Sequence, residues 1–358
     1  MSVSYTWVQW NRHKRRYDLL LAALIVLYLV GFAGVTTIIY TGQSAISPLI
    51  MLIRATGTLA ITMLILILAI GPLARLFPSR FAPLLYNRRH FGVTTFFVAL
   101  IHAALVLLWY GSFGVVDPIT AMLTMNPRYG SFVGFPFEVF GIVALVVLFY
   151  LAATSHDFWL KNLSPRVWKA LHMSVYVAYL SVVLHVALGA MQSERSPLYP
   201  SLLLSSAVGL AVLHLLAGCR EVRGDQAALP ADEDWLDIDW LDIAAVHEVP
   251  VDRAKVVKLA GCERVAVFRH GDKLSAVSNV CAHQAGPLGE GKVVDGCITC
   301  PWHGYQYRPD SGQSPPPYHE KIATYRIRVR GERIEIDPKP NPPGTPVEPA
   351  LIGGELSG

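Results

Sequence analysis

The chain has few charged residues and no sequence motif for a soluble nucleotide cofactor. Charged residues make up 16% of its 358 positions, against 53% hydrophobic ones. It contains neither a G-x-G-x-x-G fingerprint nor a P-loop, so no nicotinamide, flavin or nucleotide domain of these types is predicted. Its five cysteines lack the even, regular spacing of a disulfide framework. The net charge of +4 comes from basic residues concentrated beside apolar runs, and it gives no support for nucleic-acid binding.

The low charge reflects long apolar segments in the first 218 residues. Six can be drawn, covering about residues 18–40, 50–73, 91–110, 137–154, 168–190 and 199–218. Runs of about 20 apolar residues are typical of membrane-spanning helices. The sequence therefore predicts a multi-pass membrane protein with an all-α bundle of six transmembrane helices.

Basic residues near the ends of these segments predict the orientation of the bundle. Loops that stay in the cytoplasm carry an excess of Lys and Arg. One side has only Arg54, Arg128 and Arg195. The other collects Arg12, Lys14, Arg15, Arg16, Arg75, Arg80, Arg88, Arg89, Lys161, Arg166, Lys169, Arg220 and Arg223. We therefore expect a bacterial inner-membrane protein with both termini and the C-terminal domain in the cytoplasm.

The pattern changes after the sixth segment. Residues 1–16 are predicted to be a cytoplasmic tail, 17–220 the membrane domain and 221–243 an acidic linker. Residues 244–338 contain alternating or β-branched runs such as Val265–Val267 and Ile327–Val329, which indicate short strands. Residues 339–358 are rich in Pro and Gly and are predicted to be disordered. The predicted fold is thus multi-domain, with a small all-β domain after the helical bundle.

Two short clips of cysteine and histidine lie in the β domain. Cys281 and His283 form C-x-H, and Cys300 and His303 form C-x-x-H. Two thiolates and two imidazoles suit a [2Fe–2S] cluster in which one iron takes both sulfurs and the other takes both histidines. Zinc also accepts a Cys2His2 set and stays as the alternative. Cys297 is interpreted as a structural thiol, because a C-x-x-C clip with Cys300 would leave His303 unused.

The clips and the residues that follow them resemble a Rieske ferredoxin. The resemblance rests on Gly286-Pro287-Leu288 after the first clip and Gly304-Tyr305-Gln306-Tyr307 after the second. It implies one [2Fe–2S] cluster bound by the four clip residues. An oxygenase of Rieske type would also need a mononuclear iron site in a separate catalytic domain, which we do not expect after residue 338.

Two positions near the clips differ from the Rieske proteins of quinol-oxidising complexes. Those proteins carry a disulfide whose cysteines correspond to Gly286 and Trp302, so no bridge is expected here, in agreement with a reducing cytoplasm. Tyr305 stands where they have a serine hydroxyl near the cluster. Because fewer hydrogen bonds to the cluster lower its reduction potential, we predict a value nearer to about −150 mV than to +300 mV.

Histidines inside the predicted spans indicate a second site. His102 lies in the third span, His172 and His185 lie in the fifth, and His90 lies at the cytoplasmic start of the third. Ionisable residues inside a span are functional candidates by default, and imidazoles on separate helices suit axial ligation of b-type haem. The alternative is that each histidine is simply hydrogen-bonded across the bundle.

The depth of these residues predicts how they pair. The third and fifth spans run in the same direction, so His102 matches His185 and His90 matches His172. At a rise of 1.5 Å per residue the two levels lie about 18–20 Å apart, a plausible spacing for two haems. However, His172 and His185 differ by about 140° around a straight helix. Two haems therefore require a bend in the helix or a lateral offset between the haems. A single haem is the alternative, and His214 is an alternative to His90 as an inner ligand.

The membrane segment carries six short motifs: Ile53-Arg54-Ala55-Thr56-Gly57, Ile70-Gly71-Pro72-Leu73-Ala74-Arg75, Arg88-Arg89-His90-Phe91-Gly92, Leu100-Ile101-His102, Leu171-His172 and Leu184-His185. With these motifs, about residues 17–218 resemble the ferric-reductase-like transmembrane family, and within it the haem-binding membrane subunit that supplies electrons to a periplasmic methionine sulfoxide reductase. NADPH oxidases are more distant relatives. The resemblance implies b-type haem, transmembrane electron transfer, and His102, His172 and His185 as ligands; His90 has no secure counterpart.

These features together predict an electron conduit in the membrane. Electrons would enter from a soluble cytoplasmic donor, such as a ferredoxin or a flavin reductase, and pass through the cluster and one or two b-type haems. They would leave to a periplasmic or other outer-face acceptor. The chain needs no bond-making chemistry of its own, so its standing as an enzyme is open. The alternatives are a terminal ferric or quinone reductase, and a redox-sensing membrane protein without haem.

Overall fold

The computed structural model divides the chain into two compact units, one of residues 1–70 and 87–213 and the other of residues 71–86 and 214–358. It describes residues 12–40, 46–85, 87–112, 114, 116–125, 136–155, 163, 165–193, 197–226, 240–259, 264–283, 286–301, 304–316 and 318–353. The predicted acidic run of the linker, residues 232–239, and His303 lie outside the described residues.

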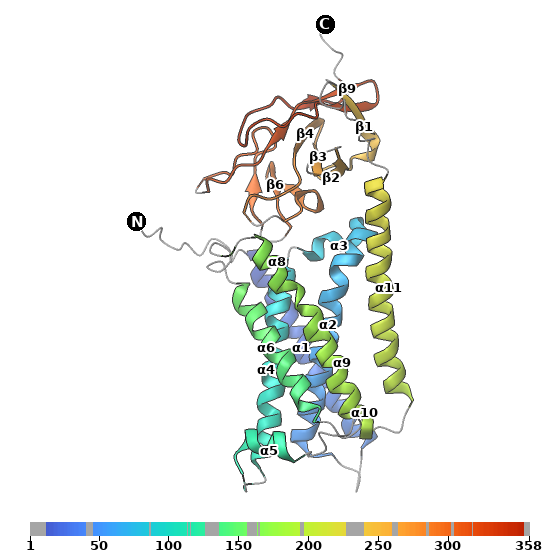
Figure 1. Cartoon of the computed structure of the whole chain (residues 1–358), viewed down its shortest axis with the longest axis vertical. Coiled ribbons are helices and arrows are strands. Elements are labelled where there is room, and N and C mark those ends of the chain that lie inside the picture. The colour runs from blue at the N-terminus through green and yellow to red at the C-terminus, as the bar shows by residue number, and fades with distance from the viewer. Residues whose placement is uncertain are drawn as a thin grey trace, which may run out of the picture. The chain divides into compact units, whose positions relative to one another are not determined.

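Helices make up the first unit, two of them continue into the second, and the short helix over residues 78–85 lies wholly in the second (Figure 1). The long helices are apolar on all sides and have no distinct polar face, whereas the short helices over residues 78–85 and 165–173 are amphipathic. The helix bounds are α1 (Arg12–Ile39), α2 (Pro48–Leu76), α3 (Pro78–Leu85), α4 (Arg88–Gly111), α5 (Pro118–Thr124), α6 (Glu138–Thr154), α8 (Pro165–Met173), α9 (Val175–Leu188), α10 (Ala190–Ser193) and α11 (Leu198–Gln226).

Five helical stretches among the described residues are long and apolar enough to cross a membrane: Arg15–Ile39, Pro48–Leu76, Arg88–Gly111, Ala170–Gln192 and Tyr199–Arg223. The sixth predicted span corresponds to α6, which has only 17 residues. At 1.5 Å per residue it is about 26 Å long, shorter than a hydrocarbon core of about 30 Å. The predicted count of six is therefore one more than the helix lengths support, although every predicted segment is helical.

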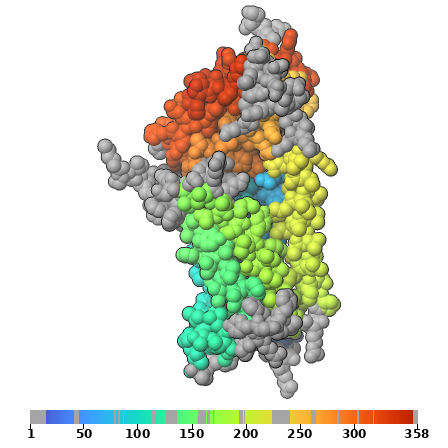
Figure 2. Space-filling view, viewed as in Figure 1, coloured from blue at the N-terminus to red at the C-terminus, as the bar shows by residue number. Residues whose placement is uncertain are grey.

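The bundle core is small, and most apolar side chains face outward. α6 packs against α4 and α9, and the space-filling view shows α6 and α9 side by side (Figure 2). The core consists of Leu64, Leu68, Phe96, Val147, Leu148, Leu151, Ala178 and Leu210. In contrast, Leu19, Leu24 and Ile38 of α1 are more than 60% exposed. Such a surface is stable in lipid and would aggregate in water.

The predicted fifth span is not one regular helix. α8 ends at Met173, a turn occupies Ser174, and α9 begins at Val175. The Ser174 amide donates to the carbonyl of Leu171 at 3.1 Å. This bond spans three residues, as in a 3₁₀ turn, and not the four of an α-helix. The Ser174 hydroxyl donates to the same carbonyl and accepts a hydrogen bond from the Tyr150 hydroxyl. A side-chain hydroxyl that bonds to a helical carbonyl bends the helix. The angle of about 140° between His172 and His185, which holds for a straight helix, therefore does not apply here.

The β domain consists of three small antiparallel sheets, with strand orders β1-β10-β9, β11-β4-β3-β2 and β5-β6-β7; β8 also pairs with β4. The strands are β1 (Leu241–Ala245), β2 (Ala254–Lys258), β3 (Arg264–His270), β4 (Lys273–Ser278), β5 (Lys292–Val294), β6 (Cys297–Thr299), β7 (Gln306–Tyr307), β8 (Thr324–Tyr325), β9 (Ile327–Arg330), β10 (Arg333–Ile336) and β11 (Ala350–Leu351), with short 3₁₀ turns η3 (Val246–Glu248) and η4 (Leu288–Glu290).

Two apolar cores fill this domain. One contains Val265, Val267, Leu274 and Ile334 among others, and it joins the first two sheets. The other contains Phe268, Val277, Ile298 and both clip cysteines, and it joins β3 and β4 to the small third sheet. The alternation of β3 explains the division, since Val265 and Val267 face one core while Ala266 and Phe268 face the other.

Two predictions about the flanks of the domain differ from the structure. Helix α11 runs through the start of the predicted linker to Gln226. The prediction of disorder for residues 339–358 is wrong for the described part of that segment, because β11 pairs with β4 and Asn341 donates to the Thr324 carbonyl. The prolines restrict the chain to extended conformations, and those can lie along a domain surface without forming a long strand.

Candidate redox centres

The first clip lies on a short loop that leaves β4. Val280 forms a bridge with Pro287, and the Cys281 amide donates to the Gly286 carbonyl at 2.9 Å, which closes the loop. The Asn279 side chain accepts the Gly289 amide at 2.7 Å and fixes the segment beyond it. Cys281 is buried as a result, whereas His283 at the tip of the loop is partly exposed.

The second clip lies between β6 and β7. The Cys300 amide donates to the Tyr305 carbonyl at 2.7 Å, and the Gly304 amide donates back to the Cys300 carbonyl at 2.9 Å. Gly304 has a φ of 70°, which favours glycine at this tight turn. Cys300 is fully buried in the same core as Cys281. The structure thus brings the two predicted sulfur ligands into one core.

Tyr307 of β7 is a further candidate site residue, which the sequence showed only as part of the motif after the second clip. Its hydroxyl lies 3.2 Å from Cys281 Sγ, and it accepts the His283 amide at 3.4 Å. Burial, and then the charge of Cys281, raises the pKa of Tyr307 well above its ordinary value, so the phenol keeps its proton. Since a metal-bound thiolate can only accept, the hydroxyl is the donor to the sulfur.

Tyr305 supports the first clip from the other side. Its ring stacks on the His283 imidazole with ring centres 4.6 Å apart and an angle of 12°. Its hydroxyl donates to the Glu320 carboxylate, which holds the ring in place. Tyr305 is therefore positioned to orient a histidine ligand, a role that differs from that of a hydroxyl near a bridging sulfur.

The two cysteines suit the sulfur side of the cluster, because Cys281 and Cys300 are buried in one core as free thiols. His283 is described as well, but no three His, Cys, Asp or Glu side chains of the described residues form a group that could hold a metal ion. The structure therefore brings the two thiols into one core without completing a ligand set. Cys297 lies on β6 outside the core that holds the clip cysteines, and burial raises the pKa of its thiol. Cys297 is half-buried and not fully buried, so its role as a structural thiol stays a prediction.

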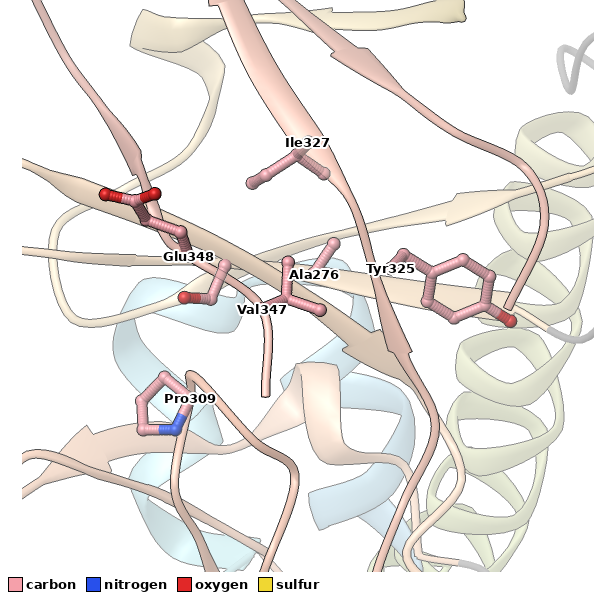
Figure 3. Close-up of a pocket in the computed structure, with 7 residues that line it drawn as sticks. Ala276, Pro309, Tyr325, Ile327, Val347 and Glu348 are labelled. Carbon is pink, nitrogen blue, oxygen red and sulfur yellow. The ribbon is translucent and has the colours of Figure 1, made fainter. Parts of the chain in front are cut away.

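Figure 3 shows a narrow crevice elsewhere in the β domain. It has no room for a water-sized molecule. The side chains around it are Ser275, Ala276, Pro309, Tyr325, Ile327, Val347 and Glu348.

In the helical bundle, the structure brings His102 of α4 and His185 of α9 together. Their ring centres are 6.3 Å apart and their planes are nearly perpendicular, at 86°. With a metal–nitrogen bond of about 2 Å on each side, two imidazoles that share one iron have ring centres about 6 Å apart. The separation therefore fits the two axial ligands of a single haem iron.

Backbone carbonyls set the orientation of both rings. His102 Nδ1 lies 3.0 Å from the Ile53 carbonyl oxygen, and His185 Nδ1 lies 2.9 Å from that of Phe137. A carbonyl can only accept, so Nδ1 carries the proton in each ring, and the lone pair is on Nε2. This is the usual arrangement of a metal-binding histidine.

Two glycines make room for these rings. A Cβ atom at Gly57 would lie 3.0 Å from His102 Cε1, and one at Gly141 would lie 2.9 Å from His185 Nδ1. At Gly141 a contact that short requires the imidazole or the backbone to shift, and at Gly57 the imidazole would have to move by a few tenths of an ångström. The sequence shows these glycines, but only the packing shows why they are needed.

The other two histidines, His172 and His90, have separate contacts. His172 stacks on Trp168 with ring centres 3.8 Å apart, its Nδ1 donates to the Trp168 carbonyl, and its Nε2 lies 3.4 Å from the Ser155 hydroxyl. His90 Nδ1 lies 2.9 Å from Asp18 Oδ1. No ring contact joins His90 to His172, both of which the structure describes. His214 lies partly buried on α11.

Comparisons with known proteins identify both parts of the chain. A family model described as "Ferric reductase like transmembrane component" matches residues 56–183, and one described as "Rieske [2Fe-2S] domain" matches residues 239–326. The haem-binding subunit MsrQ of protein-methionine-sulfoxide reductase from Ralstonia nicotianae is 32% identical over 163 residues, which are 46% of this chain and 70% of that protein.

The C-terminal part has its own relatives. The anthranilate 1,2-dioxygenase ferredoxin subunit of Burkholderia cepacia is 34% identical over 102 residues, 28% of this chain and 92% of that protein. Among solved structures, the carbazole 1,9a-dioxygenase ferredoxin of Nocardioides aromaticivorans is 25% identical, with a TM-score of 0.27 over 28% of this chain and all of that one. The chain therefore belongs to the ferric-reductase-like transmembrane family, in an MsrQ-like form to which a Rieske [2Fe–2S] domain is fused.

Proposed function

We propose that this protein carries electrons across a bacterial inner membrane, from a soluble cytoplasmic donor to an acceptor at the outer face. The observation that carries the proposal is the pair of opposed imidazoles of His102 and His185, together with the two buried cysteines of the Rieske domain. Electron transfer as such follows from the two families. The direction, the donor and the acceptor are the proposed part.

In this proposal, His102 and His185 hold a b-type haem, and Cys281, His283, Cys300 and His303 hold the [2Fe–2S] cluster. The name of the MsrQ relatives, haem-binding subunits, supports the first assignment. Each group supplies one reversible one-electron change at iron when bound. The protein supplies orientation, through the carbonyls of Ile53 and Phe137, and exclusion of water.

An inner haem ligated by His172 is the second part of the proposal. The turn at Ser174 supports it, because it removes the straight-helix angle that would aim His172 and His185 in different directions. His90 is the proposed partner of His172, and its contact with Asp18 leaves Nε2 as the nitrogen for a metal. The absence of a ring contact between His90 and His172 means that the structure gives this pair less support than it gives His102 with His185.

The proposed orientation rests on the distribution of basic residues, which puts the Rieske domain in the cytoplasm. A ferredoxin or a flavin reductase is the proposed donor, since the sequence carries no nucleotide-binding motif of its own. For the acceptor, a periplasmic protein is the proposal suggested by the MsrQ relatives, and ferric iron, oxygen or a quinone are the other candidates.

A visible difference spectrum of the purified full chain tests the proposal. We expect dithionite reduction to produce b-type haem bands, and pyridine haemochrome analysis to give one or two haems per chain. His102→Ala and His185→Ala should each remove the same haem. His172→Ala should remove a second haem if two are present and leave the first in place. A preparation with iron and sulfide but no haem would refute the conduit and favour the redox sensor.

A further inference from the structure

A buried carboxylate lies in the helical bundle close to the His102–His185 pair. Glu138 is in the first turn of α6 and is only 4% exposed. The Tyr110 hydroxyl of α4 donates to its Oε1 at 2.7 Å. Its Oε2 is buried and, within the described part of the chain, accepts no hydrogen bond. A buried carboxylate with one neutral donor is costly unless a positive charge compensates it.

The first turn of α6 also carries the contacts that orient His185. Phe137, the residue before Glu138, accepts the His185 Nδ1 proton at 2.9 Å, and the Phe137 ring lies 5.2 Å from the imidazole ring. Gly141, one turn later, is in close contact with the same imidazole. The carboxylate of Glu138 interacts electrostatically with His185. The positive charge of a haem iron bound by His185 would therefore interact with the Glu138 carboxylate.

We propose that the Glu138 carboxylate is the counter-charge of the outer haem, the one between His102 and His185, and that it lowers the reduction potential of this haem. The inference rests on the proposed haem between His102 and His185. A ferric haem with two neutral imidazoles carries a net positive charge at its centre, and the ferrous form does not. An anion nearby therefore stabilises the oxidised form, and Glu138 has no other cation among its described contacts.

Local structure stabilises the charged form of the Glu138 carboxylate. The N-terminus of α6 has partial positive charge, which favours an acidic residue in the first turn. The Tyr110 hydrogen bond adds to this and aims the carboxylate. A lower potential at this site makes the reduced haem a stronger reductant, so Glu138 would favour the last step, electron transfer from this haem to an outer acceptor.

The test compares Glu138→Gln with wild type in the purified, haem-loaded full chain by spectroelectrochemical titration. Glutamine has the same shape and no charge. We expect the equilibrium constant for reduction of this haem to rise about tenfold, a positive shift of about 59 mV for a one-electron couple. Glu138→Asp should stay close to wild type. Asp117→Asn, which neutralises an exposed acid before α5, should cause no shift.

The possible results are distinct. A haem-loaded Glu138→Gln variant with an unchanged or lower potential overturns the inference, even if the proposed function holds. Haem missing from wild type, or retained in His185→Ala, overturns the proposed site itself. If Glu138→Gln purifies without haem, Tyr110→Phe decides: the Tyr110 hydrogen bond stabilises the Glu138 anion, so its loss should favour the neutral carboxyl and raise the haem potential, and an unchanged potential overturns the inference.

Discussion

Replacement of Tyr307 by phenylalanine should lower the reduction potential of the [2Fe–2S] cluster. The hydroxyl lies 3.2 Å from Cys281 Sγ, and the His283 amide occupies one of its lone pairs, so its proton is directed to the sulfur. Reduction adds one negative charge to the cluster. A donor to a ligand sulfur stabilises the reduced state more than the oxidised one, so its loss disfavours reduction.

The size of the effect follows from the energy of one hydrogen bond. A neutral hydrogen bond contributes about 1 kcal/mol and one to a charged group about 1.5–3 kcal/mol. The bond exists in both oxidation states, so only the difference, about 1 kcal/mol, changes the potential. Since about 1.4 kcal/mol corresponds to 59 mV for one electron, the expected fall is about 40 mV.

A redox titration of the full chain, followed by the electron paramagnetic resonance signal of the reduced cluster, measures this fall. Tyr325→Phe is the matched control, because Tyr325 is also a buried tyrosine of the β domain but lies in the other core. Its potential should equal that of wild type. A Tyr307→Phe potential that is unchanged or higher, with the cluster signal intact, would show that the hydroxyl does not donate to the sulfur.

Three further predictions concern packing and charge. Gly141→Val should lose most of its haem by the pyridine haemochrome assay, since its Cβ would meet His185, whereas Gly209→Val, with nothing within 4 Å of the added atom, should keep it. Leu274→Ala in the buried β core should lower the free energy of unfolding by about 2–5 kcal/mol. The cluster absorbance should then be lost at a lower urea concentration, and an unchanged midpoint would contradict the core assignment. Burial lowers the pKa of His270, so the folded state binds fewer protons and stability should fall as the pH drops below about 6.5; His270→Gln should weaken that dependence in thermal unfolding.

The sequence indicated the fold class because both halves have strong periodic signals. Long apolar runs predict helices in lipid, and each predicted run is helical in the structure. Length was the weaker signal: the α6 region is apolar enough but ends after 17 residues. The turn at Ser174 could not be predicted, because no Pro or Gly marks it and its cause is a hydrogen bond from Tyr150 across the bundle.

For the site residues too, the sequence pattern identified some features, and others depend on contacts that only the structure shows. Depth along two parallel helices is a matter of counting, and it matched His102 with His185, which the structure brings within 6.3 Å. The residues that orient these rings, Ile53 and Phe137, act through backbone carbonyls. A carbonyl has no sequence signature, so spacing and composition could not identify them.

Tyr307 also changes what is expected of the cluster potential. The prediction of a value near the low end of the Rieske range considered only the loss of a serine hydroxyl at Tyr305. The structure adds a different hydroxyl, that of Tyr307, on the sulfur of Cys281, and this one raises the potential. The two effects oppose each other, so the wild-type value should lie above the low end by about the 40 mV that one such hydrogen bond contributes. The Tyr307→Phe variant, which lacks both hydroxyl contacts, should then define the low end itself.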